Sequence, residues 1–390
     1  MTNYIWQDEQ WPRFIYNIKA FKPYLATLAY NFNIAQDLYS RVSPIPKHQM
    51  LVDTISNEIV YSLKLDGEDI SMEKTKDSVT RYLKFDDVKL YSEEQDTHID
   101  YIVASFLNTL SNKELNNSLS NETILSTHHD LEGVGVTYKE GLVEYAPSVY
   151  RSEPYHNDEN DYDAPSSDNI EKEMNAFLYY FNNMLNDSKE NLYIKSAIFH
   201  LHFETIHPFT KNNSRVTRFI SLIPFTLIPF GQEKISLCHM FSISKILYEH
   251  KEEYYAKLSE AQKGDLNITS WISWYLDIFN KAVIEMVEDI TFYFRLTALN
   301  EKIHNLDKPI NDRQINAIFT LFYEKEDKLS YKEYASIFSC DEETARFELS
   351  MLEGNGLLEK TIDNEGNFYY VVEEKPTYYI TPEEIASPHN

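Results

Sequence analysis

The sequence contains few glycines and few cysteines. Glycine accounts for 9 of the 390 residues, about a third of its usual share of about 7%, so few loops can depend on the left-handed backbone that glycine adopts without strain. The two cysteines, Cys238 and Cys340, lie far apart in the chain, and neither has a second cysteine or a histidine at the spacing of a zinc site. These absences exclude a disulfide framework and favour two reduced thiols.

Basic residues and long hydrophobic runs are also scarce. There are 36 Lys and Arg against 62 Asp and Glu, a formal net charge of −26, and a protein that binds nucleic acid needs clustered cations. We therefore do not expect nucleic acid as the main partner. The most apolar stretch, 219–230, is too short to span a bilayer and contains Pro224 and Pro229. The N-terminus lacks the basic and apolar regions of a secretory signal, so we expect no membrane association and a cytoplasmic location.

Hydrophobic residues, by contrast, are plentiful. They make up 43% of the chain, with 29 Tyr and 22 Phe among them, which is enough for packed cores. Apolar residues recur three and four positions apart, as at Phe14, Ile18, Phe21 and Leu25, a spacing typical of amphipathic helices. We therefore expect a mainly α protein. Its predicted parts are an N-terminal helical domain at 1–90, a central helical domain at 91–300, a C-terminal domain at 301–372 and a flexible tail at 373–390.

The C-terminal domain has its own pattern. Three helical segments follow one another between 315 and 352, and two extended segments around a turn that contains glycine come after them, which is the order of a winged helix-turn-helix. Residues 311–360 carry six basic and eleven acidic side chains, a net charge of −5. Because a DNA-binding domain gains affinity from phosphate contacts, we expect this domain to bind protein instead, either a partner or a second copy in a homodimer.

One segment concentrates chemically active side chains: HPFTKNNSRVTR, which starts at His207. A helix is expected to begin near Asn213 or Ser214, because both are good N-cap residues. Helix N-termini attract anions, phosphate above all, and Arg215 and Arg218 would face the same anion. His207 could act as a general base, since the ordinary pKa of histidine lies near neutrality. The segment therefore predicts a catalytic site that binds phosphate.

This segment resembles the signature of Fic-domain proteins, His-Pro-Phe-x-(Asp/Glu)-Gly-Asn-Gly-Arg-x-x-Arg, and the lead-in AIFHLHFETIHPF is also similar to that family. The resemblance covers most of residues 4–372, because a bacterial subset of the family places a helical domain before the Fic domain and a winged helix after it. It implies a Fic-type helical bundle at 91–300. The implied activity is transfer of AMP from ATP to a hydroxyl of a target protein or of the protein itself.

The resemblance also implies roles for individual residues. His207 would take the proton from the attacking hydroxyl, and Arg218 would contact the terminal phosphate of ATP. The other contacts to the nucleotide phosphates would come from Lys211, Asn212, Asn213, Ser214 and Arg215.

The sequence departs from the family pattern at three places. Lys211 replaces the acid that holds Mg²⁺, and an ammonium group cannot ligate a metal, so we expect no metal site and a direct contact of Lys211 with phosphate. Asn212 and Ser214 replace two glycines; Asn tolerates left-handed backbone and Ser much less, so we expect a reshaped loop. Residues 150–162, where the family has a hairpin that docks the target, lack strand alternation. We expect neither that hairpin nor docking by strand addition.

A second element resembles the inhibitory motif of the family, Ser/Thr-x-x-x-Glu-Gly/Asn. The matching residues are Ser62, Asp66 and Gly67. The resemblance implies that Asp66 pairs with Arg218 and blocks the place of the terminal phosphate, an ordinary contact between a carboxylate and a guanidinium. Aspartate is one methylene shorter than glutamate, so a looser contact, or none, is expected.

Three functions remain open at this point. The chain is a nucleotidyltransferase with N-terminal autoinhibition, or a degenerate Fic protein that binds nucleotide or phosphate without turnover as a regulator or scaffold, or an enzyme with another diphosphate donor. Other histidines are assigned to structure: His200 and His202 are expected in packing, and the pair His128 and His129 has no further residues at the spacing of a metal site.

Overall fold

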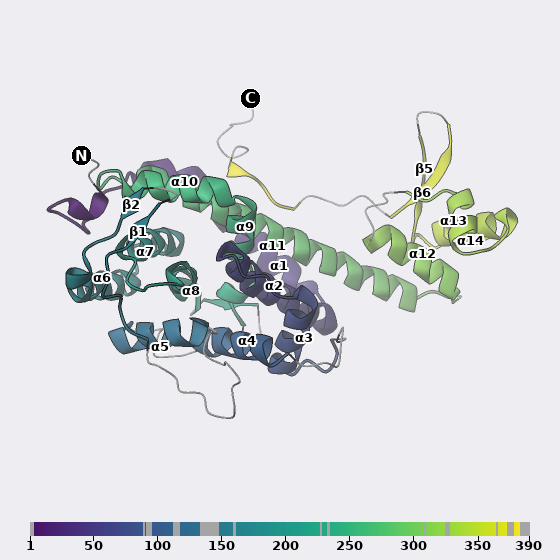
Figure 1. Ribbon diagram of the computed structural model, residues 1–390. Coiled ribbons are helices and arrows are strands. Elements are labelled where there is room, and N and C mark those ends of the chain that lie inside the picture. The colour runs from purple at the N-terminus through teal and green to yellow at the C-terminus, as the bar shows by residue number, and fades with distance from the viewer. Residues whose placement is uncertain are drawn as a thin grey trace. The chain divides into compact units, whose positions relative to one another are not determined.

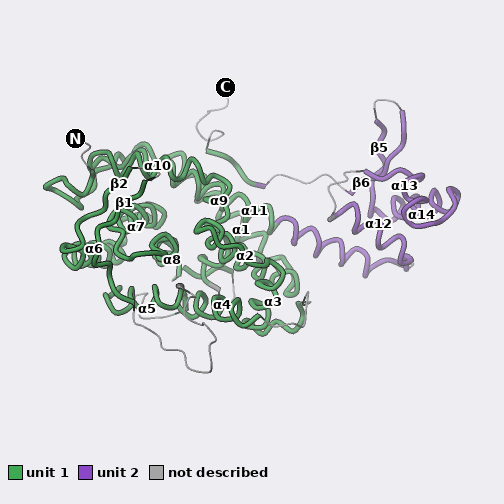
Figure 2. Tube along the Cα trace, in the orientation of Figure 1, with its two compact units in different colours: residues 1–290, 379–390 green, residues 291–378 purple. Residues whose placement is uncertain are grey.

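The chain folds into two compact units, shown in different colours in Figure 2. In this computed structural model, the first unit contains residues 1–290 and 379–390 and the second contains residues 291–378. The residues that the structure describes are 4–88, 90, 96–111, 118–132, 148–158, 161–226, 228–231, 235–307, 309–323, 328–363, 366–372 and 378–382.

The first unit begins with 3-10 helices η1 (Ile5–Gln7) and η2 (Ile18–Phe21) and continues with α-helices whose ends follow local signals (Figure 1). Ser71 and Asp96 each accept a hydrogen bond from a backbone N–H of the helix that follows, as N-cap residues do. The helices are α1 (Lys22–Arg41), α2 (Pro44–Leu65), α3 (Met72–Leu83), α4 (Thr97–Leu110) and α5 (Asn121–Glu132).

The rest of the first unit contains short hairpins and further helices. Strands β1 (His156–Asn157) and β2 (Tyr162–Asp163) pair antiparallel, as do β3 (Pro229–Phe230) and β4 (Ile235–Ser236). The helices are η3 (Ser167–Asn169), α6 (Ile170–Leu185), α7 (Leu192–Ile206), α8 (Asn213–Thr226), η4 (Leu237–His239), α9 (Ile243–Glu249), α10 (Lys251–Gln262) and α11 (Thr269–His304), the last of which continues into the second unit.

Helices α7 and α8 form the centre of the first unit. Every residue of α7 from Ile194 to Ile206 is buried, and so is every residue of α8 from Arg215 to Thr226. A helix that is buried on all sides belongs to the core, and α7 packs against α8, α6 and α10. The signature segment is therefore the connection between two core helices.

The two histidines of α7 contribute to this packing. The ring nitrogens of His200 lie 2.9 Å from the hydroxyls of Tyr254 and Tyr275. The ring of His202 contacts aromatic rings on several sides, and neither of its nitrogens has a hydrogen-bond partner among the described residues. Burial lowers the pKa of His202 to about 3. The rings around His202 belong to Trp11, Phe14, Phe177 and Tyr180.

The second unit has three helices followed by a hairpin. They are α12 (Asp312–Tyr323), α13 (Tyr331–Ile337), α14 (Glu342–Gly354), β5 (Glu359–Ile362) and β6 (Phe368–Val371), with the two strands antiparallel. Ser330 and Glu333 form a capping box at the start of α13, and the helices share one core with the end of α11. The element order matches the sequence expectation, while the assignment as a winged helix stays a prediction.

Residues 379–382 of the C-terminal tail belong to the first unit and contact α1 within it. The backbone of Ile380 exchanges two hydrogen bonds with the side chain of Asn31 on α1.

Across the described residues as a whole, helices dominate, so the prediction of a mainly α fold is confirmed. Within the same residues, no helix is long and apolar enough to cross a membrane.

Candidate functional site

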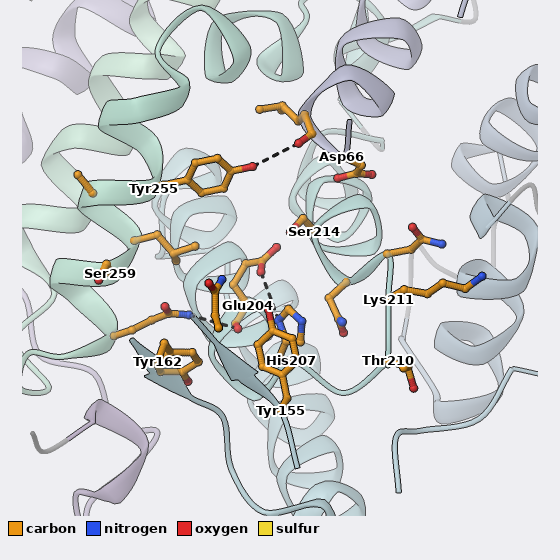
Figure 3. Close-up of a pocket in the computed structure, with 17 residues that line it drawn as sticks. Asp66, Tyr155, Tyr162, Glu204, His207, Thr210, Lys211, Ser214, Tyr255 and Ser259 are labelled. Atoms are coloured by element: carbon orange, nitrogen blue, oxygen red, sulfur yellow. Dashed lines mark hydrogen bonds and ion pairs between the residues drawn. The ribbon is translucent and has the colours of Figure 1, made fainter. Parts of the chain in front are cut away.

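A cavity of about 690 Å³ opens at the junction of α7 and α8. We call residues 207–212, which connect α7 to α8, the signature loop. Figure 3 shows the side chains that line the cavity. Asp66 comes from the end of α2, Tyr255 and Ser259 come from α10, and Thr210 and Lys211 of the signature loop lie opposite α10. Asn212, Asn213 and Ser214 line the cavity as well. The signature segment therefore faces a space large enough for a small-molecule ligand.

His207 ends α7 and lines the cavity. Its backbone is left-handed, with φ of 49°, and its N–H donates to the carbonyl of Phe203. The imidazole stacks on the ring of Tyr155 at 3.7 Å between centroids. Burial, and secondly the nearby Arg151 cation, lower the pKa of His207 to about 3. The imidazole is therefore neutral at physiological pH, the form that accepts a proton.

Asn213 closes the signature loop and begins α8. Its side-chain oxygen accepts from the N–H of Phe209 and its side-chain nitrogen donates to the carbonyl of Phe209, both at 2.8 Å. Asn212 is left-handed, with φ of 60°, which Asn tolerates. Ser214 lies inside the first turn of α8 and is not among the described residues with positive φ. Ser214 therefore has ordinary helical backbone and does not adopt the left-handed conformation that serine tolerates poorly.

Asp66 lies where the two signature arginines meet. Its carboxylate accepts from Nε of Arg215 at 2.9 Å and from a terminal nitrogen of Arg218 at 2.8 Å. Both arginines are at least 95% buried, and Arg218 also donates to the hydroxyl of Ser62 at 2.9 Å. Gly67 follows with φ of 84°, which lets the chain leave α2 directly after Asp66. The predicted residues Ser62 and Asp66 are thus brought together with Arg218.

A second carboxylate, which we do not predict from the sequence, joins this cluster. Glu68 accepts from Arg215 at 2.8 Å, while the remaining nitrogen of Arg215 donates to the carbonyl of Leu131 at 2.9 Å. Arg215 and Arg218 were expected to face an anion, and the anions that they face are carboxylates of the same chain. The acidic sequence DGED at residues 66–69, directly after α2, is the sequence signal that could have pointed to Glu68.

Arg151 and His128 contact the signature loop from outside and were not predicted. Arg151 donates from Nε to the carbonyl of His207 at 2.8 Å. His128 stacks on Phe209 at 3.8 Å, and its Nε2 lies 3.1 Å from the carbonyl of Lys211. A sequence signal existed for Arg151, which is the sole Lys or Arg between residues 140 and 171.

The expectation that no hairpin covers the site is wrong. Strands β1 and β2 pair with His156 opposite Asp163 and Asn157 opposite Tyr162. Alternation is missing because each strand has two residues, and tertiary contacts hold the hairpin instead: the hydroxyl of Tyr162 donates to the carbonyl of Thr205 at 2.6 Å. The hairpin therefore lies beside His207, as Figure 3 shows through Tyr155 and Tyr162.

Comparison with known proteins agrees with the signature. Residues 118–223 match the model of the Fic/DOC family. The chain therefore contains a Fic/DOC domain at these residues, as the signature predicts. The N-terminal residues 4–85 match a domain of unknown function, DUF4172, and none of the curated proteins compared with the chain matched it.

Solved structures of Fic proteins are similar to this chain at low sequence identity. A Fic family protein from Desulfovibrio desulfuricans has a TM-score of 0.49 at 18% identity, over 92% of this chain and 97% of that one. A Fic domain containing signaling protein from Bacteroides thetaiotaomicron has a TM-score of 0.44 at 15% identity, over 68% and 97%. Fic-1 from C. elegans also has a TM-score of 0.44 at 15% identity, over 73% and 74%.

Proposed function

We propose that the protein transfers AMP from ATP to a hydroxyl of a target protein or of itself. The observation that carries this proposal is the position of His207 at a cavity that Asn213 and Ser214, in the first turn of α8, also line. The imidazole takes the proton of the attacking hydroxyl, the hydroxyl oxygen bonds to the α-phosphorus, and the bond to pyrophosphate breaks. Positioning and charge stabilisation supply most of the catalysis in such transfers.

The signature loop does not fit the magnesium ion that its family implies. Lys211 stands at the ligand position, and its ammonium group has no lone pair to give a metal. In our proposal Lys211 contacts the nucleotide phosphates directly as a point charge.

The contacts of Asp66 support autoinhibition as part of the proposal. A carboxylate that bonds to Arg215 and Arg218 occupies the donors that a phosphate would use. Nucleotide phosphates would therefore compete with Asp66, and activity would require the segment after α2 to release the two arginines.

The same contacts favour one alternative. Because both arginines already have carboxylate partners and Lys211 replaces the metal ligand, a Fic protein that binds nucleotide without turnover also fits. A different diphosphate donor in the same cavity is the third candidate.

Labelling of the full chain with ATP that carries its label on the α-phosphate separates these functions. We expect weak self-labelling of the wild type, stronger labelling of Asp66→Ala, and none of Asp66→Ala/His207→Ala. Chelation of divalent metals should leave the label unchanged, whereas labelling that requires Mg²⁺ would contradict the role of Lys211. Binding of ATP by Asp66→Ala without any label would establish the binding protein, and absence of ATP binding would direct the test to other diphosphate donors.

A further inference from the structure

The signature loop adopts left-handed backbone at two residues that are not glycine. These are His207, with φ of 49°, and Asn212, with φ of 60°. This conformation is disfavoured for most residues with a Cβ atom, such as His207, and Asn212 tolerates it less readily than glycine would; no glycine occurs between Gly141 and Gly231. The loop conformation that places His207 at the cavity therefore needs support from outside the loop.

Arg151 supports the start of the loop. Its Nε donates to the carbonyl of His207 at 2.8 Å, and its backbone N–H donates to the carbonyl of Pro208 at 2.9 Å. The two terminal nitrogens donate to the carbonyls of Glu153 and Pro165, at the two ends of the segment that contains the β1–β2 hairpin. One side chain that is 5% exposed thus joins the hairpin to the backbone of His207.

His128 supports the end of the loop. Its Nε2 donates to the carbonyl of Lys211 at 3.1 Å, directly before the left-handed Asn212, and its Nδ1 accepts from the hydroxyl of Ser148 at 2.7 Å. Its ring stacks on Phe209, whose backbone is paired with the side chain of Asn213. The contacts of His128 and Arg151 therefore cover both ends of the loop.

We infer that Arg151 and His128 are positioning residues, which hold the glycine-free loop in its left-handed conformation and keep His207 at the cavity. This inference rests on the proposed function for the role of His207 as base. Glycine at these positions would need less support, since it adopts left-handed backbone without strain. Hydrogen bonds from Arg151 and His128 thus stabilise a backbone conformation that glycine residues would adopt without such support.

The charge of Arg151 adds an effect on His207. Groups that face the imidazole come from α7 (Glu204, whose carboxylate lies 3.9 Å away) and from the hairpin segment (Tyr155 and Arg151). After burial, the nearby Arg151 cation is the next cause that lowers the pKa of His207. Arg151 therefore also favours the neutral imidazole.

The test is hydrogen exchange of the Phe209 amide in the full chain without nucleotide. His128→Phe keeps the stacking and loses the donor to Lys211, and we expect exchange about tenfold faster than in the wild type. His128→Gln should stay near the wild-type rate because it can still donate. Asn212→Gly added to His128→Phe should slow the exchange again, since glycine removes the strain.

Arg151→Met and Arg151→Lys form a second pair, with Lys195→Met as the matched control. Lys195 is also a buried cation that donates to backbone carbonyls, those of Leu185 and Asp187, at the start of α7. We expect the Phe209 amide to exchange faster in Arg151→Met than in the wild type, and NMR titration to give a raised pKa for His207 in that variant. Arg151→Lys and Lys195→Met should show neither change. Should Arg151→Met not fold, Arg151→Lys and the His128 variants carry the test.

Equal exchange of Phe209 in the wild type, His128→Phe and Arg151→Met would overturn the inference. So would equally fast exchange in Lys195→Met, because that result would mean general destabilisation. Both readouts need no nucleotide, so a wild type that fails to bind ATP refutes the proposed function and leaves this test intact.

Discussion

Buried arginines in two regions of the first unit have different kinds of partner. Arg151 donates to backbone carbonyls of His207, Glu153 and Pro165. Arg215 and Arg218 also donate to one backbone carbonyl each, those of Leu131 and Ser62, but unlike Arg151 they share a carboxylate, that of Asp66. A phosphate group of a ligand can replace a carboxylate as the partner of an arginine, because both are anions. The neutral backbone carbonyls around Arg151 have no such equivalent in a ligand that carries phosphates. The first arrangement therefore serves structure, and the second is suited to exchange of partners.

The largest effect that would test this difference is on stability. Arg151→Met leaves buried carbonyls without a donor, and each unsatisfied buried group is costly, so we expect a loss of about 3 kcal/mol in the free energy of unfolding. Urea unfolding measures it. A loss below about 1 kcal/mol would show that Arg151 is not a structural cation.

Buried histidines differ from the buried arginines in charge. An imidazole can become neutral when it is buried, whereas a guanidinium stays charged. The folded-state pKa values of His202 and His207 are lowered to about 3 from 6.5. The unfolded chain therefore binds more protons between about pH 3 and 6.5, and stability falls as the pH falls through that window. Glu204, with its pKa raised to about 6 from 4.5 by burial, acts in the opposite direction between those two values.

His202→Phe should make unfolding less sensitive to acid. At pH 5 the wild type is expected to lose about 2 kcal/mol more than the variant, relative to pH 7, by urea unfolding at both pH values. His98→Phe, at an exposed position of α4, is the control and should follow the wild type. Parallel profiles for the wild type and His202→Phe would contradict the assignment of His202 as a neutral core residue.

Removal of Asp66 should change ligand affinity. Asp66→Ala frees donors of Arg215 and Arg218, so we expect ATP to bind about tenfold more tightly by calorimetry. Asp69→Ala is a matched control from the same segment, because the Asp69 side chain is 86% exposed. If Asp66→Ala binds ATP no better than Asp69→Ala does, the carboxylate does not compete with phosphate.

The smallest expected effect concerns Glu68. Its side chain is 39% exposed, against 13% for Asp66, and exposed ion pairs contribute little. Glu68→Gln should therefore tighten ATP binding by about twofold to threefold, less than Asp66→Ala. An effect as large as that of Asp66→Ala would mean that the two acids share the inhibitory contact equally.

Local patterns predicted much of this molecule and missed what depends on distant contacts. The start of α8 at Asn213 agrees with the expectation from the residue types at 213 and 214, which is a local signal. The β1–β2 hairpin was missed because its strands are too short to alternate and because Tyr162 anchors it to Thr205. Ser214 stands where the family signature has a glycine, but only the structure shows that this position is helical and needs no left-handed backbone.

By itself, the sequence determined the mainly α fold, the signature between two core helices and the resemblance that pointed to Asp66 and Arg218. These depend on periodicity and short motifs, which act over a few residues. Only the tertiary structure decided that Asp66 bonds to both arginines, one of them 149 positions away, and that Arg151 and His128 contact the loop. Such partners meet because α2, α5 and the hairpin pack around the α7 and α8 core, and no local pattern specifies which buried donor meets which carbonyl.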